Sequence, residues 1–380
     1  MFKIPVLFTL ICLTFSLTSV AQLDNRILGF DQPVHSKDSG KLMFSFNDLN
    51  FMRNTEYFTP IERGETLFGY EVNPNLVFYP TKKFRITGGL IFRKDFGNNN
   101  FTFVLPFYSL KYSSNGLSGI FGNLEGGVQH RLIEPMYNID YTITRPLESG
   151  AQFKINHSRL WSDTWINWEH MIYDNSPYKE EIANGSSNYM KVIESPNDSF
   201  YVTIPIQFSM HHLGGQISSV GADTLPLNSM YSAATGLIID KKFNSSSIDE
   251  IRTEDYYTWT RTFTGGNYVN FPSGKGYYFN LLFKTPIHFS FMISYWYGEK
   301  YYFPEGTDIY QSISDFNPKF LSPIRKLLFL RFFYQRQIYK DLWINLRMEP
   351  YHSFDLHTTE YSYSVYISYK RDFTLMKPGS

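Results

Sequence analysis

The chain has 380 residues and carries 35 basic and 35 acidic side chains, so its formal charge is zero. This balance excludes a bulk electrostatic attraction to nucleic acid or to acidic lipid. The one cysteine, Cys12, lies in an N-terminal segment that we expect to be removed, which excludes disulfides, thiol catalysis and thiolate metal sites from the mature protein.

The first 21 residues have the features of a secretory signal peptide. Lys3 supplies the positive charge, residues 4–17 form an apolar run, and Ser19, Val20 and Ala21 form a small-x-small cleavage site. The apolar run is shorter than the roughly 20 residues that a membrane-spanning helix requires. We therefore expect cleavage of residues 1–21. Residues 22–40 contain turn formers without alternation, and they form either a periplasmic tail or a small plug.

From about Lys41 onward, segments of two-faced character alternate with turns, without a long stretch of helical period. One face of each segment is apolar and the other is mostly polar, as a strand between lipid and an interior requires. Aromatic residues reach 18%, which suits the aromatic girdles of such a barrel. The sequence predicts one transmembrane antiparallel β-barrel over residues 41–373, with about 16–18 strands, and a periplasmic tail over 374–380. The clearest segments are 84–93, 202–210, 287–297, 342–349 and 361–373.

Turn lengths predict the orientation, because outer-membrane barrels keep short turns in the periplasm and long loops outside. The short links predicted here are residues 80–83, 113–116, 145–150, 285–286 and 339–341. The long loops predicted are residues 53–64, 243–273 and 301–322. If the C-terminus is periplasmic, the order of the last strands places residues 285–286 and 339–341 in the periplasm. It places residues 301–322 outside the cell, so the two rules agree over the last strands.

Candidate catalytic and metal-binding residues are few. His157 precedes Ser158 directly, and His211 precedes His212, but neighbours on a strand point to opposite faces and cannot easily share one site. The pair Glu180 and Glu181 falls in a predicted turn. No catalytic, cofactor-binding or metal-binding residue is therefore predicted, and the expectation is that the protein is not an enzyme and needs no cofactor.

Inward-facing charges are the better place to look for function. On the predicted register, basic residues outnumber acidic ones on the inner face, which would favour the passage of anions. The alternative is an interior in which these charges pair across strands and pass nothing. The predicted pore-lining residues are Arg85, Arg93, Lys154, Glu169, Lys284, Asn345, Arg347, Glu349 and Lys370.

The apolar–polar alternation and the final strand with its aromatic Phe373 resemble the porin-like outer-membrane β-barrel proteins of Gram-negative bacteria. The abundance of Phe, Tyr and Asn is similar to that of proteins from the Bacteroidota. The chain differs from strict porins in running past Phe373 to Ser380. The resemblance implies an outer-membrane location and insertion by the barrel insertion machinery.

The resemblance also implies passive diffusion of small hydrophilic solutes through the lumen. A barrel of about 16 to 18 strands is wide enough for an aqueous channel. The alternative is a non-conducting barrel that serves as a surface-binding or secretion-assembly component, and an outer-membrane hydrolase is the least favoured function. Partners expected are outer-membrane lipid and the solutes, without nucleic acid; a homo-oligomer is left open.

Overall fold

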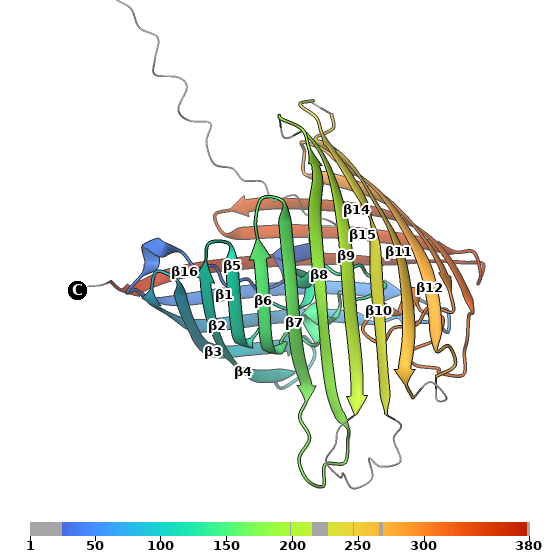
Figure 1. The fold of residues 1–380 in the computed structure, drawn as a ribbon, viewed down its shortest axis with the longest axis horizontal. Helices are drawn as coiled ribbons and strands as arrows, with labels where there is room; N and C mark the ends of the chain where they lie inside the picture. The colour runs from blue at the N-terminus through green and yellow to red at the C-terminus, as the bar shows by residue number, and fades with distance from the viewer. Residues whose placement is uncertain (1–24, 198, 215–226, 246, 266–268, 378–380) are drawn as a thin grey trace, which may run out of the picture.

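The computed structural model describes residues 25–197, 199–214, 227–245, 247–265 and 269–377. In these residues the chain forms a closed barrel of 16 antiparallel strands, in which each strand pairs with its neighbours in sequence and the first pairs with the last (Figure 1). The predicted fold class, a single antiparallel barrel of about 16–18 strands, is confirmed. The predicted signal peptide lies outside the described residues.

The strands follow one another with few interruptions. The other regular elements in the described residues are short helical turns, which lie before β1 or in the segments between strands. The strands are β1 (Leu42–Glu56), β2 (Thr66–Thr81), β3 (Phe84–Asp95), β4 (Phe103–Ser114), β5 (Leu117–Asn123), β6 (Ser149–Asn156), β7 (Leu160–His170), β8 (Glu180–Glu194), β9 (Phe200–Gly214), β10 (Asn228–Lys242), β11 (Glu250–Thr264), β12 (Ser273–Lys284), β13 (Phe289–Glu299), β14 (Ile324–Tyr339), β15 (Leu342–Ser353) and β16 (Thr358–Met376). The helical turns are η1 (Asn25–Leu28), η2 (Ser36–Asp38), η3 (Gly127–His130), α1 (Tyr141–Thr144) and η6 (Asp308–Tyr310).

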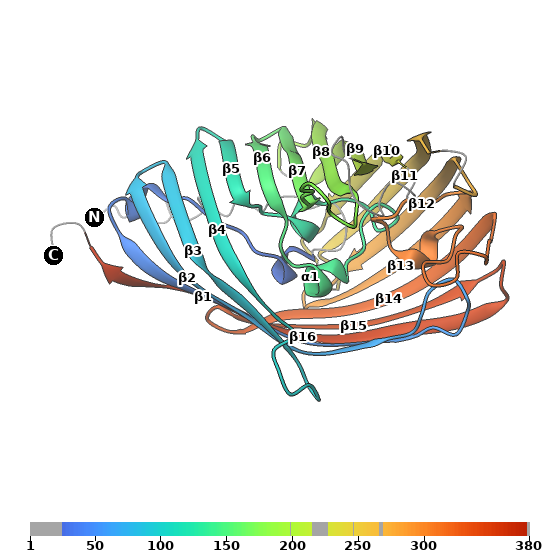
Figure 2. The same ribbon diagram turned by 90° about the horizontal axis from the view of Figure 1, so that it is seen from below.

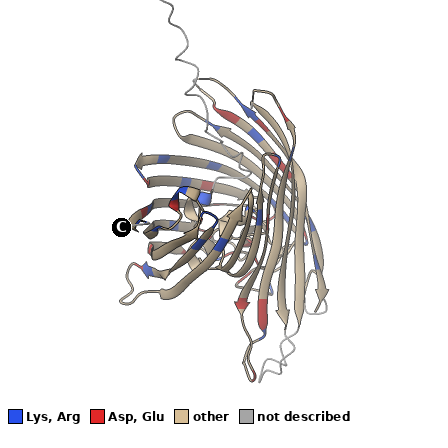
Figure 3. Ribbon diagram, turned by 60° about the vertical axis from the view of Figure 1, so that its left-hand side comes forward, with Lys and Arg blue, Asp and Glu red and all other residues tan. Residues whose placement is uncertain are grey.

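Each strand separates two environments by its period of two. In β16, Ser362, Ser364 and Ser368 are buried inside the barrel, whereas Tyr361 and Ile367 face outward and are exposed. Figure 3 shows the charged residues along the strands and at their ends. Several of those within strands are buried, among them Arg252, Arg325 and Arg331. In contrast, Asp48 of β1 faces outward and accepts a hydrogen bond of 2.6 Å from Asn50. None of the described helices is long and apolar enough to cross a membrane.

The short turns gather at one rim. The link from β4 to β5 is Asn115-Gly116, and both residues have positive φ, 52° and 77°, as a two-residue type I′ hairpin requires. The links from β2 to β3 and from β14 to β15 are equally short and lie on the same side, so we assign this rim to the periplasm. The opposite, extracellular rim carries the long segments 124–148 and 300–323.

Two of the predicted connections are wrong. Residues 145–150 are not a short turn, because they end the long segment 124–148 and begin β6. Residues 243–273 are not one loop, because β11 occupies Glu250–Thr264. In β11 the inward side carries Glu250, Arg252 and Glu254, and polar residues on the outward side hide the alternation that identifies a strand. β16 also continues to Met376, past the predicted end of the barrel at residue 373.

The interior of the barrel is filled by three segments of the chain, residues 25–41, 124–148 and 300–323 (Figure 2). The described part of residues 22–40, the predicted tail or plug, lies inside, where the backbone N–H of Gln32 donates a hydrogen bond of 2.7 Å to the Glu125 carboxylate. Met136 and Phe303 are 0% exposed and share one hydrophobic cluster with Trp296 of the wall. The hydrophobic core of this protein therefore lies in the lumen.

Candidate functional site

Several of the predicted pore-lining residues contact the segments that fill the lumen. Arg85 donates a hydrogen bond of 3.2 Å to the Pro33 carbonyl, and Arg93 donates one of 2.8 Å to the Ile143 carbonyl. Lys154 pairs with Glu125 at 2.9 Å. Lys370 donates a hydrogen bond to the Gly29 carbonyl. These cations are held by the filling segments.

The remaining predicted pore-lining residues pair with neighbours on the wall or join a cluster described below. Lys284 forms an ion pair of 3.1 Å with Glu250. Arg347 donates a hydrogen bond of 2.8 Å to Asn345, and Glu349 lies 3.3 Å from Arg331. Glu169 lies at the extracellular end of β7. Most of the predicted pore-lining charges are thus held by hydrogen bonds or ion pairs with neighbouring groups.

Two cavities between the filling segments and the wall are of the size of single water molecules. One of about 10 Å³ lies beside Glu134, Tyr278 and Arg331, and another of about 20 Å³ lies between residues 29–30 and 124–128. A cavity needs roughly 10–15 Å³ of this volume to hold one water. Neither is a passage for a solute.

At the centre of the lumen, Glu134 of segment 124–148 binds Arg331 of β14. Two guanidinium nitrogens of Arg331 donate to its two carboxylate oxygens, at 3.0 and 2.6 Å. The hydroxyls of Tyr278 and Tyr310 also donate to this carboxylate. Burial alone would raise the pKa of Glu134, but the guanidinium outweighs it and holds the pKa below its usual value. This ion pair fastens the segment to the wall.

A second buried network surrounds His130 of segment 124–148. Its Nδ1 lies 3.0 Å from Asp163 of β7 and its Nε2 lies 2.7 Å from Glu148, while the ring stacks on Trp165 at 3.6 Å. Burial disfavours the charged ring, but the two carboxylates prevail and raise the pKa of His130 to about 9. The imidazole is therefore protonated near neutral pH and cannot serve there as a general base.

The His130 network predicts a loss of stability in alkaline solution. The folded pKa of about 9 lies above the ordinary value of 6.5, so the stabilisation is complete below pH 6.5 and is lost as the pH rises through about 9. We expect the urea midpoint of the refolded barrel to fall between pH 7 and pH 10. The control is the His130→Gln variant, which should show a shallower fall. An equal fall in both proteins would assign the pH dependence to other groups.

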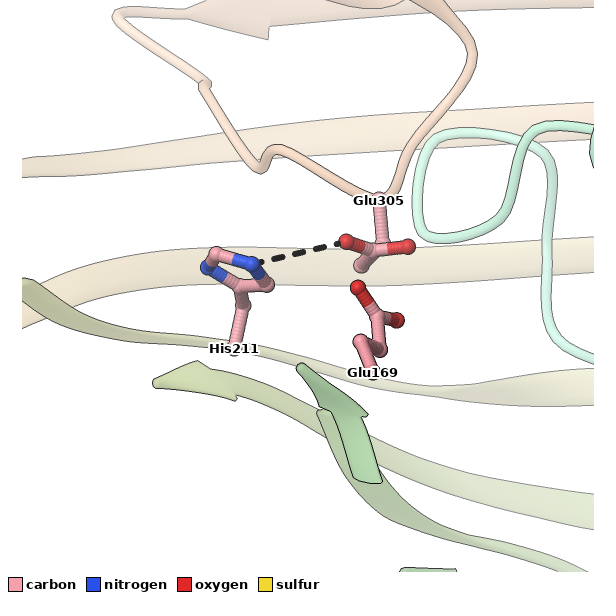
Figure 4. Close-up of side chains that lie close together, drawn as sticks. All are labelled: Glu169, His211 and Glu305. Carbon is pink, nitrogen blue, oxygen red and sulfur yellow. Dashed lines mark ion pairs between the residues drawn. The ribbon is translucent and has the colours of Figure 1, made fainter. Parts of the chain in front are cut away.

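At the extracellular mouth of the lumen, Glu169, His211 and Glu305 converge from three elements (Figure 4). Glu169 ends β7, His211 lies near the end of β9, and Glu305 belongs to segment 300–323. One ligand atom from each lies within 4.8 Å of the others. Glu181 of β8 lies 2.9 Å from His211 Nε2. Such a group of carboxylates and imidazole can hold a divalent cation or exchange protons.

Residue spacing along the sequence does not reveal this cluster. In the sequence His211 is adjacent to His212, and the structure places these two rings on opposite faces of β9. Glu305 comes from a segment that folds back into the lumen, which residue spacing does not reveal. Burial raises the pKa of Glu305, because the nearby His211 and Arg145 do not fully offset it.

His212, on the outward face of β9, forms a second candidate site with Ser229 of β10. Its Nδ1 lies 2.7 Å from Ser229 Oγ, and the two residues are direct partners in the register of β9 and β10. A hydroxyl within hydrogen-bond reach of an imidazole is the geometry of a nucleophile beside its base. A similar pair, His352 and Thr359, lies between β15 and β16 at 2.9 Å. His157 and Ser158, in contrast, lie in the turn between β6 and β7.

Solved outer-membrane proteins share this fold. A loop-deletion mutant of OmpT from Vibrio cholerae is 11% identical, with a TM-score of 0.51 over 88% of this chain and 100% of that one. OmpF from Salmonella typhi, in complex with daunomycin, is 12% identical, with a TM-score of 0.50 over 88% of this chain and 99% of that one. At such identities the likeness shows the fold alone. The predicted resemblance to porin-like outer-membrane barrels is confirmed in the fold, which agrees with the predicted outer-membrane location.

Sequence comparison gives a different indication of function. A search of curated proteins returned no match. Residues 34–378, however, match the model of a family described as Lipid A 3'-O-deacylase-type. That description names an enzyme family, so the expectation that the protein is not an enzyme is wrong. Since the match spans nearly the whole barrel, the chain belongs to the Lipid A 3'-O-deacylase-type family.

Proposed function

We propose that this protein hydrolyses an ester-linked acyl chain of an outer-leaflet lipid, with Ser229 as the nucleophile and His212 as its base. The observation that carries the proposal is the hydrogen bond of 2.7 Å between Ser229 Oγ and His212 Nδ1 on the outward face of the barrel. The family description, which names the removal of an O-linked acyl chain from lipid A, supports the same reaction class.

The position of the pair suits a lipid substrate. Ser229 is the second residue of β10 and His212 lies two residues before the end of β9, so both are at the extracellular rim. Towards the membrane centre, Phe208, Tyr231 and Phe263 form an outward aromatic row, with ring centroids 5.8 and 6.3 Å apart. Aromatic rows of this kind mark the membrane interface in barrels. The ester groups of lipids lie near this depth, between headgroups and acyl chains.

The reaction would proceed by acyl transfer. Ser229 Oγ attacks the ester carbonyl while His212 Nδ1 accepts the hydroxyl proton. Collapse of the tetrahedral intermediate breaks the bond to the alkoxide, which takes the proton from His212 and leaves as an alcohol. A water molecule, deprotonated by His212, then hydrolyses the acyl-serine and releases a fatty acid. Ser229 is buried, so the ester must displace side chains around it on binding.

The test is fatty-acid release from lipid A in vesicles that contain the refolded protein, measured by mass spectrometry. We expect Ser229→Ala and His212→Gln each to lower the rate at least about 100-fold, since general-base catalysis contributes typically that much or more. The matched control is Thr359→Ala, which removes the hydroxyl of the other pair and should keep the rate. Equal release by the wild type and Ser229→Ala would exclude the Ser229–His212 pair.

A second candidate function is passive diffusion of small solutes. A barrel of 16 strands is wide enough for an aqueous channel when its lumen is empty. Support for this function is weaker, because residues 25–41, 124–148 and 300–323 occupy the lumen and pair with its inner charges. Conductance, treated in the Discussion, separates the two candidates.

A further inference from the structure

We propose that Glu169, His211 and Glu305 bind one divalent transition-metal cation at the extracellular mouth of the lumen, and that this cation fastens segment 300–323 to strands β7 and β9. The three residues come from different elements and meet only in the folded barrel (Figure 4). The site is separate from the Ser229–His212 pair, because His211 and His212 point to opposite faces of β9.

The geometry is that of an open metal site. The three ligand atoms lie within 4.8 Å of one another. Bonds of about 2.0–2.2 Å from Zn²⁺ to nitrogen and oxygen require ligand atoms somewhat closer together than this, so the side chains would move inward by about 1 Å.

Glu305 provides an independent indication of a ligand. It is 8% exposed, and its carboxylate accepts no hydrogen bond from any residue in the described part of the chain. Its nearest cationic atom is His211 Nε2, at 3.8 Å, beyond hydrogen-bond length. The buried carboxylates Glu125 and Glu134, in contrast, both accept hydrogen bonds from cations. A buried carboxylate without such donors is costly, and a bound cation would compensate it.

The surroundings favour a cation and narrow its type. Glu181 contacts both His211 and His170, at 2.9 and 2.7 Å, so a further carboxylate lies beside the three ligands. The guanidinium of Arg145 lies near Glu305 and balances part of the negative charge of the carboxylates. Imidazole with carboxylates suits Zn²⁺ better than Ca²⁺ or Mg²⁺, which prefer oxygen ligands alone.

A cation here would hold both extracellular segments in place. Two backbone hydrogen bonds join the segments. The backbone N–H of Asn138 donates to the backbone carbonyl of Glu305 at 2.8 Å, and that of Thr307 donates to the backbone carbonyl of Glu134 at 2.9 Å. Segments 124–148 and 300–323 are thus joined beside the site. A metal bound to Glu305 would connect this joined unit to the wall at Glu169 and His211.

The experiment is calorimetric titration of the refolded, chelator-stripped barrel with Zn²⁺. We expect one Zn²⁺ per chain, and an affinity at least about 100-fold lower in Glu305→Gln, since even partners outside the ligand shell contribute about 10–100-fold. Glu299→Gln, an exposed carboxylate at the same rim, is the matched control and should bind as the wild type does. Ser229→Ala should bind Zn²⁺ as the wild type does. Zn²⁺ binding can therefore be tested independently of the hydrolysis proposed for Ser229 and His212.

A change in folding is distinguished from the loss of a ligand by a second variant. Glu169→Gln alters only the wall and should weaken Zn²⁺ binding to a similar degree. Heat-modifiable migration on gels reports whether each barrel is folded. Absence of Zn²⁺ binding by the wild type, or unchanged affinity in folded Glu305→Gln and Glu169→Gln, would overturn the proposal.

Discussion

Replacing Arg331 with alanine is expected to destabilise the barrel by about 3–5 kcal/mol, because it leaves a buried carboxylate without its partner. Arg331 is 2% exposed and binds both oxygens of Glu134, and it also lies 3.3 Å from Glu349. Urea unfolding of the refolded protein measures the change in the free energy of unfolding.

Two variants show whether this loss comes from the unpaired charge. In the double variant Arg331→Met with Glu134→Gln, no carboxylate remains at position 134, so the destabilisation should be smaller than in Arg331→Ala. Lys275→Ala removes an exposed ion pair with Glu299 and should leave the unfolding midpoint unchanged. A loss for Arg331→Ala no larger than that for Lys275→Ala would mean that the Glu134 pair does not fasten the segment.

Removal of the two extracellular filling segments is expected to convert a silent barrel into a conducting one. The wild type should show no stable current steps in planar bilayers, because Met136, Phe303 and Tyr310 are 0% exposed in the filled lumen. A variant in which short Gly-Ser linkers replace residues 126–146 and 303–320 should show resolvable steps. The wall of 16 strands remains closed by its own hydrogen bonds.

Conductance of the wild type decides between the two candidate functions. Stable steps in the unaltered protein would favour passive diffusion and would show that the filling segments leave the lumen in a membrane. Silence of both the wild type and the folded deletion variant would mean that residues 25–41 and the inner side chains close the lumen by themselves.

The barrel could be predicted from the sequence because its main signal is local. Alternation along β16 identifies both faces of one strand without knowledge of its partners. Where the inner face carries charges and the outer face polar groups, as in β11, that signal is lost, and the sequence predicts a loop in place of the strand. The position of segments 124–148 and 300–323 inside the lumen depends on packing against distant strands, which a local pattern does not encode.

The candidate sites could not be predicted because their residues meet through pairing between strands. Ser229 and His212 become neighbours only through the register of β9 and β10. Glu305 reaches Glu169 because its segment turns into the lumen. Residues adjacent in the sequence, such as His157 and Ser158, are visible without a structure, but strand geometry separates such neighbours. A sequence pattern of this kind therefore does not reveal an enzyme whose residues lie on paired strands.

The contact of β1 with β16 links closure of the barrel to the filling of its interior. Leu49 and Phe51 of β1 and Tyr366 of β16 pack in one cluster with Leu28 and Ile143, which belong to two of the filling segments. These residues are separated by most of the chain, and contacts of such long range form late in folding. The seam between the first and last strands thus shares its inner contacts with the filling segments. Closure of the barrel and docking of its interior therefore stabilise each other at this seam.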